Sequence, residues 1–327
     1  MEPPGAAGER MMTIRDAGDR AGAGLKGLAT AVAAAVACLG GGGATATAQE
    51  RPGSPLSEAD LAARASVRPI SASKIILVGD STTAVAGGWG PSFCAYHVTA
   101  FAACVNLARG GRSSGSYIWE GSWDLALSEM STPGYAAIYV LIQFGHNDQP
   151  GRPGRSTDLA TEYPAFLRRY VEETRARGAI PVLLTPLTRR QFVDGRLRCD
   201  LEAWAEAVRT VARETNTPLV DLNARSGDVV EALGPMLSAR FAQLPPSPEV
   251  AAALLTGTTV SAGAPAAGPV PAPPAPAQHN AAVEPLGQAR VSFDYTHLGR
   301  EGADVFAAMV AHELVLAVPA LRPLIVP

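Results

Sequence analysis

The chain has 327 residues, of which 47% are hydrophobic and 17% charged. This is the composition of a globular protein with one sizeable domain or two small ones, and it excludes a disordered or fibrous chain. The formal net charge of −3 and the scattered basic residues argue against a nucleic-acid partner.

Residues 1–48 have the pattern of a secretory signal peptide. Arg15, Arg20 and Lys26 precede an apolar stretch over 28–39, and the small residues Ala46-Thr47-Ala48 provide a cleavage site. The apolar stretch is too short to span a bilayer as a permanent helix. We therefore expect a secreted or periplasmic protein without a membrane span.

A second outcome of export is a lipid anchor. The run Ala35-Val36-Ala37-Cys38 faintly resembles a lipoprotein cleavage box, which would leave Cys38 lipidated at the cell envelope. Simple cleavage after Ala48 ranks higher, because alanine is a poor residue for the first position of such a box. In either case residues 49–72 are predicted to be a linker, followed by one catalytic domain over 73–320.

Export makes disulfides permissible. Cys94, Cys104 and Cys199 follow the predicted cleavage site. Cys94 and Cys104 could join a helix to the following strand and leave Cys199 as a free thiol, while three small buried side chains are an equal alternative. No C-x-x-C pair or Cys/His cluster indicates zinc.

From residue 74 onward, short apolar runs alternate with longer helical patterns. Runs that are apolar throughout are typical of strands buried on both faces of a parallel sheet. The predicted strands span 74–78, 104–107, 136–142, 181–184 and 219–222. The predicted helices span 91–102, 123–129, 163–177, 201–215 and 299–316. Repeated strand–helix units with right-handed crossovers predict an α/β fold, a three-layer α/β/α sandwich.

A long excursion precedes the last predicted helix. Thirteen of the seventeen residues from 261 to 277 are Pro or Ala, a composition that favours extended, solvated backbone. We predict a disordered insertion at about 245–287, and a lid that contacts substrate is the alternative.

Four polar blocks stand at predicted strand ends, where ligands bind in an open parallel sheet. The first contains Asp80 and Ser81, and the last runs from Asp294 to His297. All four are Gly79-Asp80-Ser81-Thr82-Thr83, 106–113, Gly145-His146-Asn147-Asp148 and Asp294-Tyr295-Thr296-His297.

These blocks contain the parts of a serine esterase. Such an enzyme needs a hydroxyl, a base, a carboxylate that orients the base, and donors that face the developing oxyanion. Ser81, His297 and Asp294 are the candidates for the first three. Gly111 can bring a backbone N–H close, since it lacks a Cβ, and Asn147 can aim a side-chain N–H at the same point.

The four blocks resemble the SGNH (GDSL-like) hydrolase superfamily, whose signature is Ser, Gly, Asn and His in four ordered blocks. Within it, the chain is similar to the rhamnogalacturonan acetylesterase-like carbohydrate esterases, in which Thr follows the nucleophile, as Thr82 does here. Further matches are Gly88-Trp89-Gly90, Gly111-Arg112-Ser113, Phe144 to Asp148, Thr185-Pro186, Arg189-Arg190, 219–226, Thr296-His297-Leu298 and Gly302-Ala303. The resemblance covers 74 to about 316, and the Pro/Ala-rich insertion is its main departure.

The resemblance implies a flavodoxin-like, five-stranded parallel sheet and an esterase without a cofactor or metal. It implies Ser81 as nucleophile, with Asp294 and His297 completing the triad. It also implies an oxyanion hole from the N–H groups of Ser81 and Gly111 and the side chain of Asn147. The implied substrate is an acetylated plant cell-wall polysaccharide, pectin-like or xylan-like, and we expect a monomer.

Each of these residues also has a possible structural role. Ser81 alone could cap a helix, and Asn147 could form an Asx-turn. Trp89 and Arg112 are candidates for sugar contact, although Trp more often packs in cores. We expect His146 to be a hydrogen-bonded structural residue and Asp80 to support the turn before Ser81.

Three other functions are alternatives. One is lipase or thioesterase activity within the same superfamily, and another is sugar binding without catalysis. The third is a metallophosphoesterase, suggested by the Gly-His-Asn-Asp run at 145–148, although such sites need more Asp and His ligands at early strand ends. Against sugar binding without catalysis, a protein that had lost its activity would usually lack a member of the triad, and none is missing here.

Overall fold

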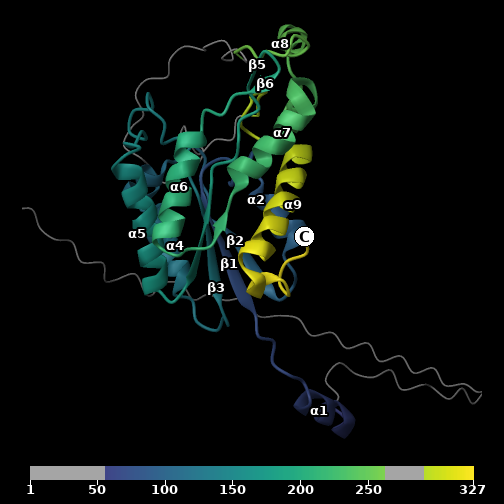
Figure 1. The fold of residues 1–327 in the computed structure, drawn as a ribbon. Coiled ribbons are helices and arrows are strands. Elements are labelled where there is room, and N and C mark those ends of the chain that lie inside the picture. Colours follow the sequence, from purple (N-terminus) through teal and green to yellow (C-terminus); the bar gives the residue numbers. More distant parts are fainter. Residues whose placement is uncertain (1–55, 262–290) are drawn as a thin grey trace, which may run out of the picture. The chain divides into compact units, whose positions relative to one another are not determined.

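The computed structural model describes residues 56–261 and 291–327 (Figure 1). The predicted signal peptide, Cys38 and most of the Pro/Ala-rich stretch lie outside the described residues. The described residues fall into two units, one that ends at residue 66 and one that begins at residue 67. In the first unit, helix α1 (Glu58–Ala65) starts at a Ser57–Asp60 capping box and buries none of its side chains. This helix falls within the predicted linker.

A five-stranded, all-parallel sheet forms the centre of the second unit. Its strand order is β2-β1-β3-β4-β7, which is the flavodoxin-like order. The strands are β1 (Ser73–Gly79), β2 (Ala102–Asn106), β3 (Ile138–Gln143), β4 (Ile180–Leu184) and β7 (Leu219–Val220). The predicted α/β class and sheet are thus confirmed.

Alternate residues of β1 enter two separate cores, one on each face of the sheet. Ile75 and Leu77 pack on one face, in a cluster with Phe306. Ile76 and Val78 pack on the other, in a cluster with Trp123. Because both faces are covered, the strand is apolar throughout.

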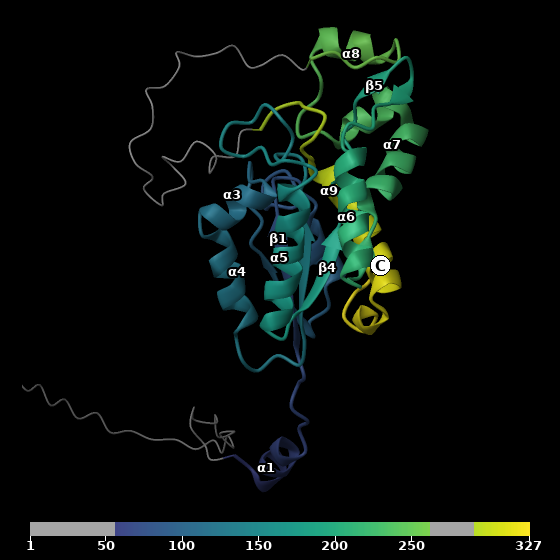
Figure 2. The same ribbon diagram turned by 60° about the vertical axis from the view of Figure 1, so that its left-hand side comes forward.

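Helices form a layer on each side of the sheet (Figures 1 and 2). The first face carries α2 (Gly90–Ser92), the π-helix η1 (Phe93–His97), α7 (Leu222–Ser238) and α9 (Arg300–Ala317). The second carries α3 (Ser114–Trp119), α4 (Ser122–Met130), α5 (Glu162–Ala176) and α6 (Glu202–Glu214). Short 3-10 helices span Ala239–Phe241 and Pro319–Leu321.

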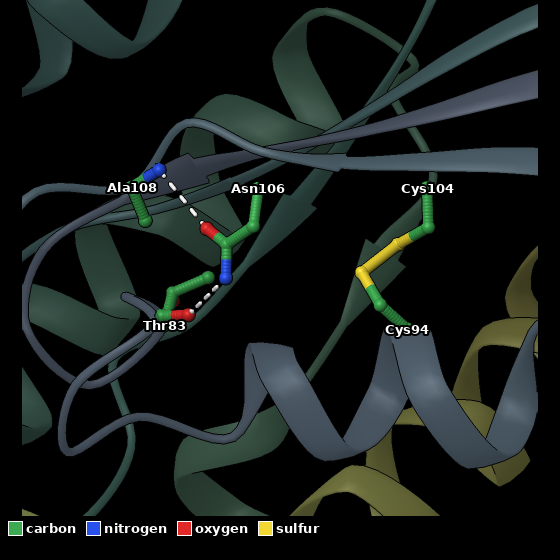
Figure 3. The surroundings of a disulfide bond; sticks show 5 residues. All are labelled: Thr83, Cys94, Cys104, Asn106 and Ala108. Atoms are coloured by element: carbon green, nitrogen blue, oxygen red, sulfur yellow. Dashed lines mark hydrogen bonds between the residues drawn. A yellow bond between two sulfur atoms is a disulfide. The ribbon is translucent and has the colours of Figure 1, made fainter.

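The helix predicted over 91–102 was too long. It ends with η1 at His97, and a turn in which Ala102 N–H donates to the Thr99 carbonyl leads directly into β2. A disulfide joins Cys94 of η1 to Cys104 of β2, with 5.5 Å between their Cα atoms (Figure 3). This is the helix-to-strand bridge considered from the sequence, and Cys199 is an exposed free thiol.

The first part of the predicted disordered insertion is ordered. Helix α8 (Pro248–Leu254) begins at Ser247, which caps it, and its Val250 and Leu254 pack against Tyr295. The chain then runs beside the hairpin of β5 (Phe192–Val193) and β6 (Arg196–Leu197), beyond the carboxyl edge of the sheet (Figure 2). The prediction therefore failed for 245–261, where buried apolar side chains repay the ordering entropy. In the described residues, no helix has the length and apolarity needed to cross a bilayer.

Candidate active site

The parallel register brings the ends of three strands together. Gly79 of β1 pairs with Gln143 of β3, and Leu77 pairs with Asn106 of β2. The connection leaving β1 crosses one face of the sheet, whereas the connection from β2 to β3 crosses the other. Ser81, two residues beyond β1, thus lies at the topological switch point, where open α/β sheets bind ligands.

Two buried polar side chains fix the turn that carries Ser81. The Asp80 carboxylate accepts hydrogen bonds from the Thr82 N–H and hydroxyl, each 2.8 Å long, as expected for a residue that supports the turn. Gln143 accepts from the Thr83 hydroxyl at 2.5 Å and from the Trp89 indole N–H at 3.0 Å. The nucleophile candidate therefore stands on a turn whose side chains have little freedom.

Ser81, His297 and Asp294 form a hydrogen-bonded series. The His297 Nε2 lies 2.9 Å from the Ser81 Oγ, and its Nδ1 lies 2.7 Å from the Asp294 Oδ2. A proton on Nδ1, donated to the carboxylate, leaves Nε2 to accept from the serine hydroxyl. The structure thus brings together the three residues expected to form the triad, from positions 216 residues apart in the chain.

The Asp294 carboxylate is fixed in orientation and charge. Its other oxygen accepts the backbone N–H of Thr296 at 2.7 Å and of His297 at 2.6 Å. Burial alone would raise the pKa of Asp294, but the hydrogen bonds and charge interaction with His297 outweigh burial and lower it to about 2. The group is ionised above that pH and can stabilise an imidazolium on His297.

Arg190 fixes the backbone of the segment from Asp294 to His297. Its fully buried guanidinium donates to the carbonyls of Asp294 at 3.0 Å, Thr296 at 3.3 Å and His297 at 2.8 Å. Burial lowers the pKa of Arg190 to about 10, which leaves it cationic at neutral pH. The sequence placed Arg190 in a matching motif but assigned it no role, because its contacts lie more than 100 residues along the chain.

The segment before Arg190 is held in turn by α7. The Asn223 N–H donates to the Thr185 hydroxyl at 2.7 Å, and its side chain donates to the Pro186 carbonyl at 2.9 Å. The Ser226 hydroxyl accepts the Thr188 N–H at 3.0 Å. These bonds account for the motif over 219–226, which fixes the chain that leads to Arg190.

The expected oxyanion donors lie at the ends of β1, β2 and β3. Asn147 donates one side-chain N–H to the Arg112 carbonyl at 3.0 Å, which places it beside the Gly111 turn and leaves its second N–H for a ligand. Gly111 has a φ of 78°, a conformation that favours glycine. In the described part of the chain, the backbone N–H groups of Ser81 and Gly111 donate to no protein acceptor.

The two residues expected to contact sugar, Trp89 and Arg112, are both buried. Trp89 has no exposed surface, packs edge-on against Phe93, and bonds Gln143 through its indole N–H. Arg112 is 3% exposed, and its Nε lies 2.8 Å from the Glu120 carboxylate. Trp89 is therefore a core residue beside the Ser81 turn, whereas Arg112 borders a hollow together with Glu120, and its contact with sugar stays a prediction.

The glycines beside Trp89 allow a close approach to the nucleophile turn. A Cβ on Gly90 would lie 2.3 Å from the Thr83 carbonyl oxygen and 2.4 Å from the Asn106 side-chain nitrogen. Asn106 itself donates to that carbonyl at 2.9 Å and accepts from the Ala108 N–H at 3.0 Å (Figure 3). The Gly-Trp-Gly motif is thus a packing requirement of this turn.

His146 is buried, but its ring does not make the hydrogen bonds that were expected. Its Nδ1 lies 3.4 Å from the Asp80 carboxylate, an ion-pair distance, and neither ring nitrogen has a hydrogen-bond partner within the described ranges. Burial would raise the pKa of Asp80, but the charge of His146 and the bonds from Thr82 lower it.

Residues 56–261 and 291–327 contain no cluster of three or more His, Cys, Asp and Glu that could hold a metal ion.

A hydroxyl, an imidazole and a carboxylate in series at the switch point of an α/β/α sandwich are the parts of a hydrolase that transfers acyl groups to serine. The GDSL-like Lipase/Acylhydrolase family profile matches residues 77–305, and the chain belongs to this family. It is accordingly a carboxylic ester hydrolase.

Two curated relatives come from Bacillus subtilis. The rhamnogalacturonan acetylesterase RhgT is 35% identical over 176 residues, which are 51% of this chain and 72% of the relative. The probable rhamnogalacturonan acetylesterase YesY is 33% identical over 47% of this chain and 72% of its own length. The crystal structure of the Bacillus subtilis protein YXIM shares the fold, with a TM-score of 0.52 and 20% identity over 76% of this chain and 57% of that protein.

Proposed function

We propose that this chain is an exported carbohydrate acetylesterase that removes O-acetyl groups from a rhamnogalacturonan-like polysaccharide through Ser81, His297 and Asp294. The observation that carries the mechanism is the continuous series of bonds from the Ser81 hydroxyl to the Asp294 carboxylate. The substrate class is supported by two relatives named as rhamnogalacturonan acetylesterases, each matched over 72% of its length.

The reaction has two acyl-transfer steps. Ser81 Oγ attacks the acetyl carbonyl while His297 Nε2 accepts its proton, and Asp294 stabilises the resulting imidazolium. The N–H groups of Ser81 and Gly111 and the Asn147 side chain stabilise the tetrahedral oxyanion. As the intermediate collapses, the imidazolium protonates the sugar oxygen, which leaves as a hydroxyl group. Water, deprotonated by His297, then attacks the acetyl-serine, and acetate leaves as the Ser81 hydroxyl regains its proton.

Export is supported by the Cys94–Cys104 disulfide, because such bonds persist in oxidising compartments. It agrees with the basic, apolar and small-residue pattern over 1–48. A polysaccharide substrate is also too large to enter a cell, so its deacetylation belongs outside the cytoplasm. Mass measurement of the mature N-terminus distinguishes cleavage after Ala48 from lipidation of Cys38.

The test compares the wild type with Ser81→Ala on acetylated rhamnogalacturonan, acetylated xylan and an aryl acetate. We expect acetate release by the wild type and a loss of at least about 10,000-fold in kcat for the variant, since the nucleophile is absent. An organophosphate probe should label the wild type at Ser81 only. A control variant, Ser128→Ala, removes an exposed serine of α4 and should retain full activity. Undiminished release by Ser81→Ala would end the proposal.

A further inference from the structure

A hollow of about 510 Å³ lies against the loop that carries Asp294 and His297. Its walls include Asp294 and Thr296, the adjacent side chain of Arg189, and residues of the loops around Arg152 and Arg198. This volume falls in the range of small-molecule sites. The hollow thus borders the loop that carries the proposed base, on the side of Asp294 and Thr296.

The charges on the walls do not balance. Asp294 is paired with His297, and Asp200 with Arg189. Arg152 and Arg198 also line the hollow, and within the described ranges neither guanidinium has a hydrogen bond or a carboxylate partner. Within the described residues, the hollow therefore presents two guanidinium groups that lack a direct partner, although the carboxylates of Asp80 and Asp200 act on Arg152 from a distance.

The backbone around both arginines is fixed by hydrogen bonds. The Arg152 N–H donates to the Ser156 hydroxyl at 2.9 Å, and the Arg152 carbonyl accepts the N–H of Ser156 at 2.9 Å. The Arg198 N–H donates to the Gln191 carbonyl at 2.7 Å. These bonds fix the backbone positions from which the two guanidinium groups extend.

The neighbourhood of Arg152 disfavours additional positive charge. Burial and the nearby cations Arg189 and Arg155 lower the pKa of this guanidinium, and together they outweigh the carboxylates of Asp80 and Asp200, which raise it. An anion bound in the hollow would offset the repulsion between these guanidinium groups. Guanidinium groups bind carboxylates with paired, charge-assisted hydrogen bonds, which makes a carboxylate a well-matched ligand.

We propose that this hollow is a subsite for the carboxylate of an acidic sugar residue adjacent to the acetylated sugar, with Arg152 and Arg198 as its ligands. The proposal rests on the proposed function and assigns the recognition of the substrate's uronic acids to these two arginines. An acidic chain lying across the hollow places its neighbouring acetyl group toward Ser81. The subsite thereby selects acidic over neutral glycans at one catalytic centre.

The test uses the double variant Arg152→Gln/Arg198→Gln, with Arg213→Gln as the matched control. Arg213 is an exposed arginine of α6 whose contacts are with Glu206 and Thr210, outside the hollow. The quantity measured is the ratio of kcat/KM on acetylated rhamnogalacturonan oligosaccharides to kcat/KM on acetylated xylooligosaccharides. We expect the ratio to fall at least about tenfold in the double variant, through KM, and to stay at the wild-type value in the control.

A second measurement uses binding without turnover. Deacetylated oligosaccharides that contain galacturonic acid should inhibit aryl acetate hydrolysis by the wild type more strongly at low than at high salt. In the double variant, the inhibition constant of these acidic oligosaccharides should rise about tenfold, whereas neutral xylooligosaccharides should inhibit both proteins equally.

The outcomes separate the two proposals. Release of acetate from rhamnogalacturonan with an unchanged ratio in the double variant would overturn the subsite and leave the proposed function standing. Hydrolysis of the aryl acetate with no release from any glycan would overturn the proposed function, and the subsite with it. Equal inhibition by acidic and neutral oligosaccharides would also overturn the subsite.

Discussion

The guanidinium of Arg190 donates to the backbone carbonyl of His297 at 2.8 Å, from a fully buried position beneath the base of the proposed triad. The same side chain binds the carbonyls of Asp294 and Thr296. The imidazole is thus oriented twice, through its ring by Asp294 and through its backbone by Arg190.

We therefore expect Arg190→Lys to lower kcat about 10- to 100-fold with little change in KM, since small displacements of a catalytic group are costly. Arg190→Met should lose as much activity and also destabilise the protein by about 2–4 kcal/mol, because three carbonyls lose their donor. Steady-state kinetics and urea unfolding measure the two effects.

Arg175 offers a matched control, because it also donates to backbone carbonyls, those of Thr215 and Asn216, away from the site. Arg175→Met should lose stability and keep its kcat. Equal kcat losses in Arg190→Met and Arg175→Met would show that Arg190 acts only through general stability.

Asn147→Ala should lower kcat about 100- to 1,000-fold, the usual effect of removing one oxyanion donor. KM should change only a few-fold, since the oxyanion forms after substrate binds. Loss of the bond to the Arg112 carbonyl should cost about 1 kcal/mol of stability as well. A kcat within threefold of the wild type would remove Asn147 from the proposed oxyanion hole.

Asp148 should make stability depend on pH. Burial and, to a smaller extent, the negative charge of Asp80 raise its pKa to about 7, although hydrogen bonds from Ser114 and Thr157 lower it. Between about pH 4 and pH 7 the folded state therefore binds a proton that the unfolded state has released. This contribution to stability is fully present below the unfolded pKa and is lost as pH rises through about 7.

The free energy of unfolding of the wild type, minus that of Asp148→Asn, should thus fall between pH 4 and pH 8, by at most on the order of 4 kcal/mol. Urea unfolding at several pH values measures this difference. Asp158→Asn is the control: the pKa of Asp158 is lowered by hydrogen bonds from Thr161, so its difference should be constant above pH 5. A difference that stays constant between pH 4 and pH 8 for Asp148→Asn would refute the raised pKa of Asp148.

The disulfide should stabilise the fold more than it affects catalysis. Replacing Cys94 and Cys104 together by Ala removes a cross-link with a sequence separation of 10 and should cost about 2–3 kcal/mol. Reduction of the wild type should have the same effect, and kcat should stay within twofold. Cys199→Ser should change neither, because this thiol is exposed. A double variant as stable as the wild type would show that the bond does not constrain the chain.

The sequence was most informative where local pattern and chemistry coincide. Apolar strands buried on both faces produced continuous runs, and the polar residues after them marked the edge at which Ser81, Gly111 and Asn147 stand. The Asp294–His297 spacing is local, so their contact could be expected without knowing the rest of the fold.

Sequence reasoning failed where tertiary packing overrides local pattern. Helix α3 is rich in serine and glycine and has little intrinsic helix preference, and Gly234 and Pro235 interrupt the pattern of α7. Gln143, the polar end of an apolar strand, was a visible signal that was not used. The role of Arg190 and the burial of Trp89 depend on contacts between distant segments, which no local pattern contains.

The residues that fix the Asp294–His297 block precede the Pro/Ala-rich stretch in the chain. Besides Arg190, the Gly87 carbonyl accepts the Leu298 N–H at 2.8 Å, and the Phe241 carbonyl accepts the Gly299 N–H at 2.8 Å. Within the described residues, the Asp294–His297 block is therefore anchored to segments that come before residue 262 in the chain. Substitutions at these anchors can alter catalysis without touching any residue of the block itself.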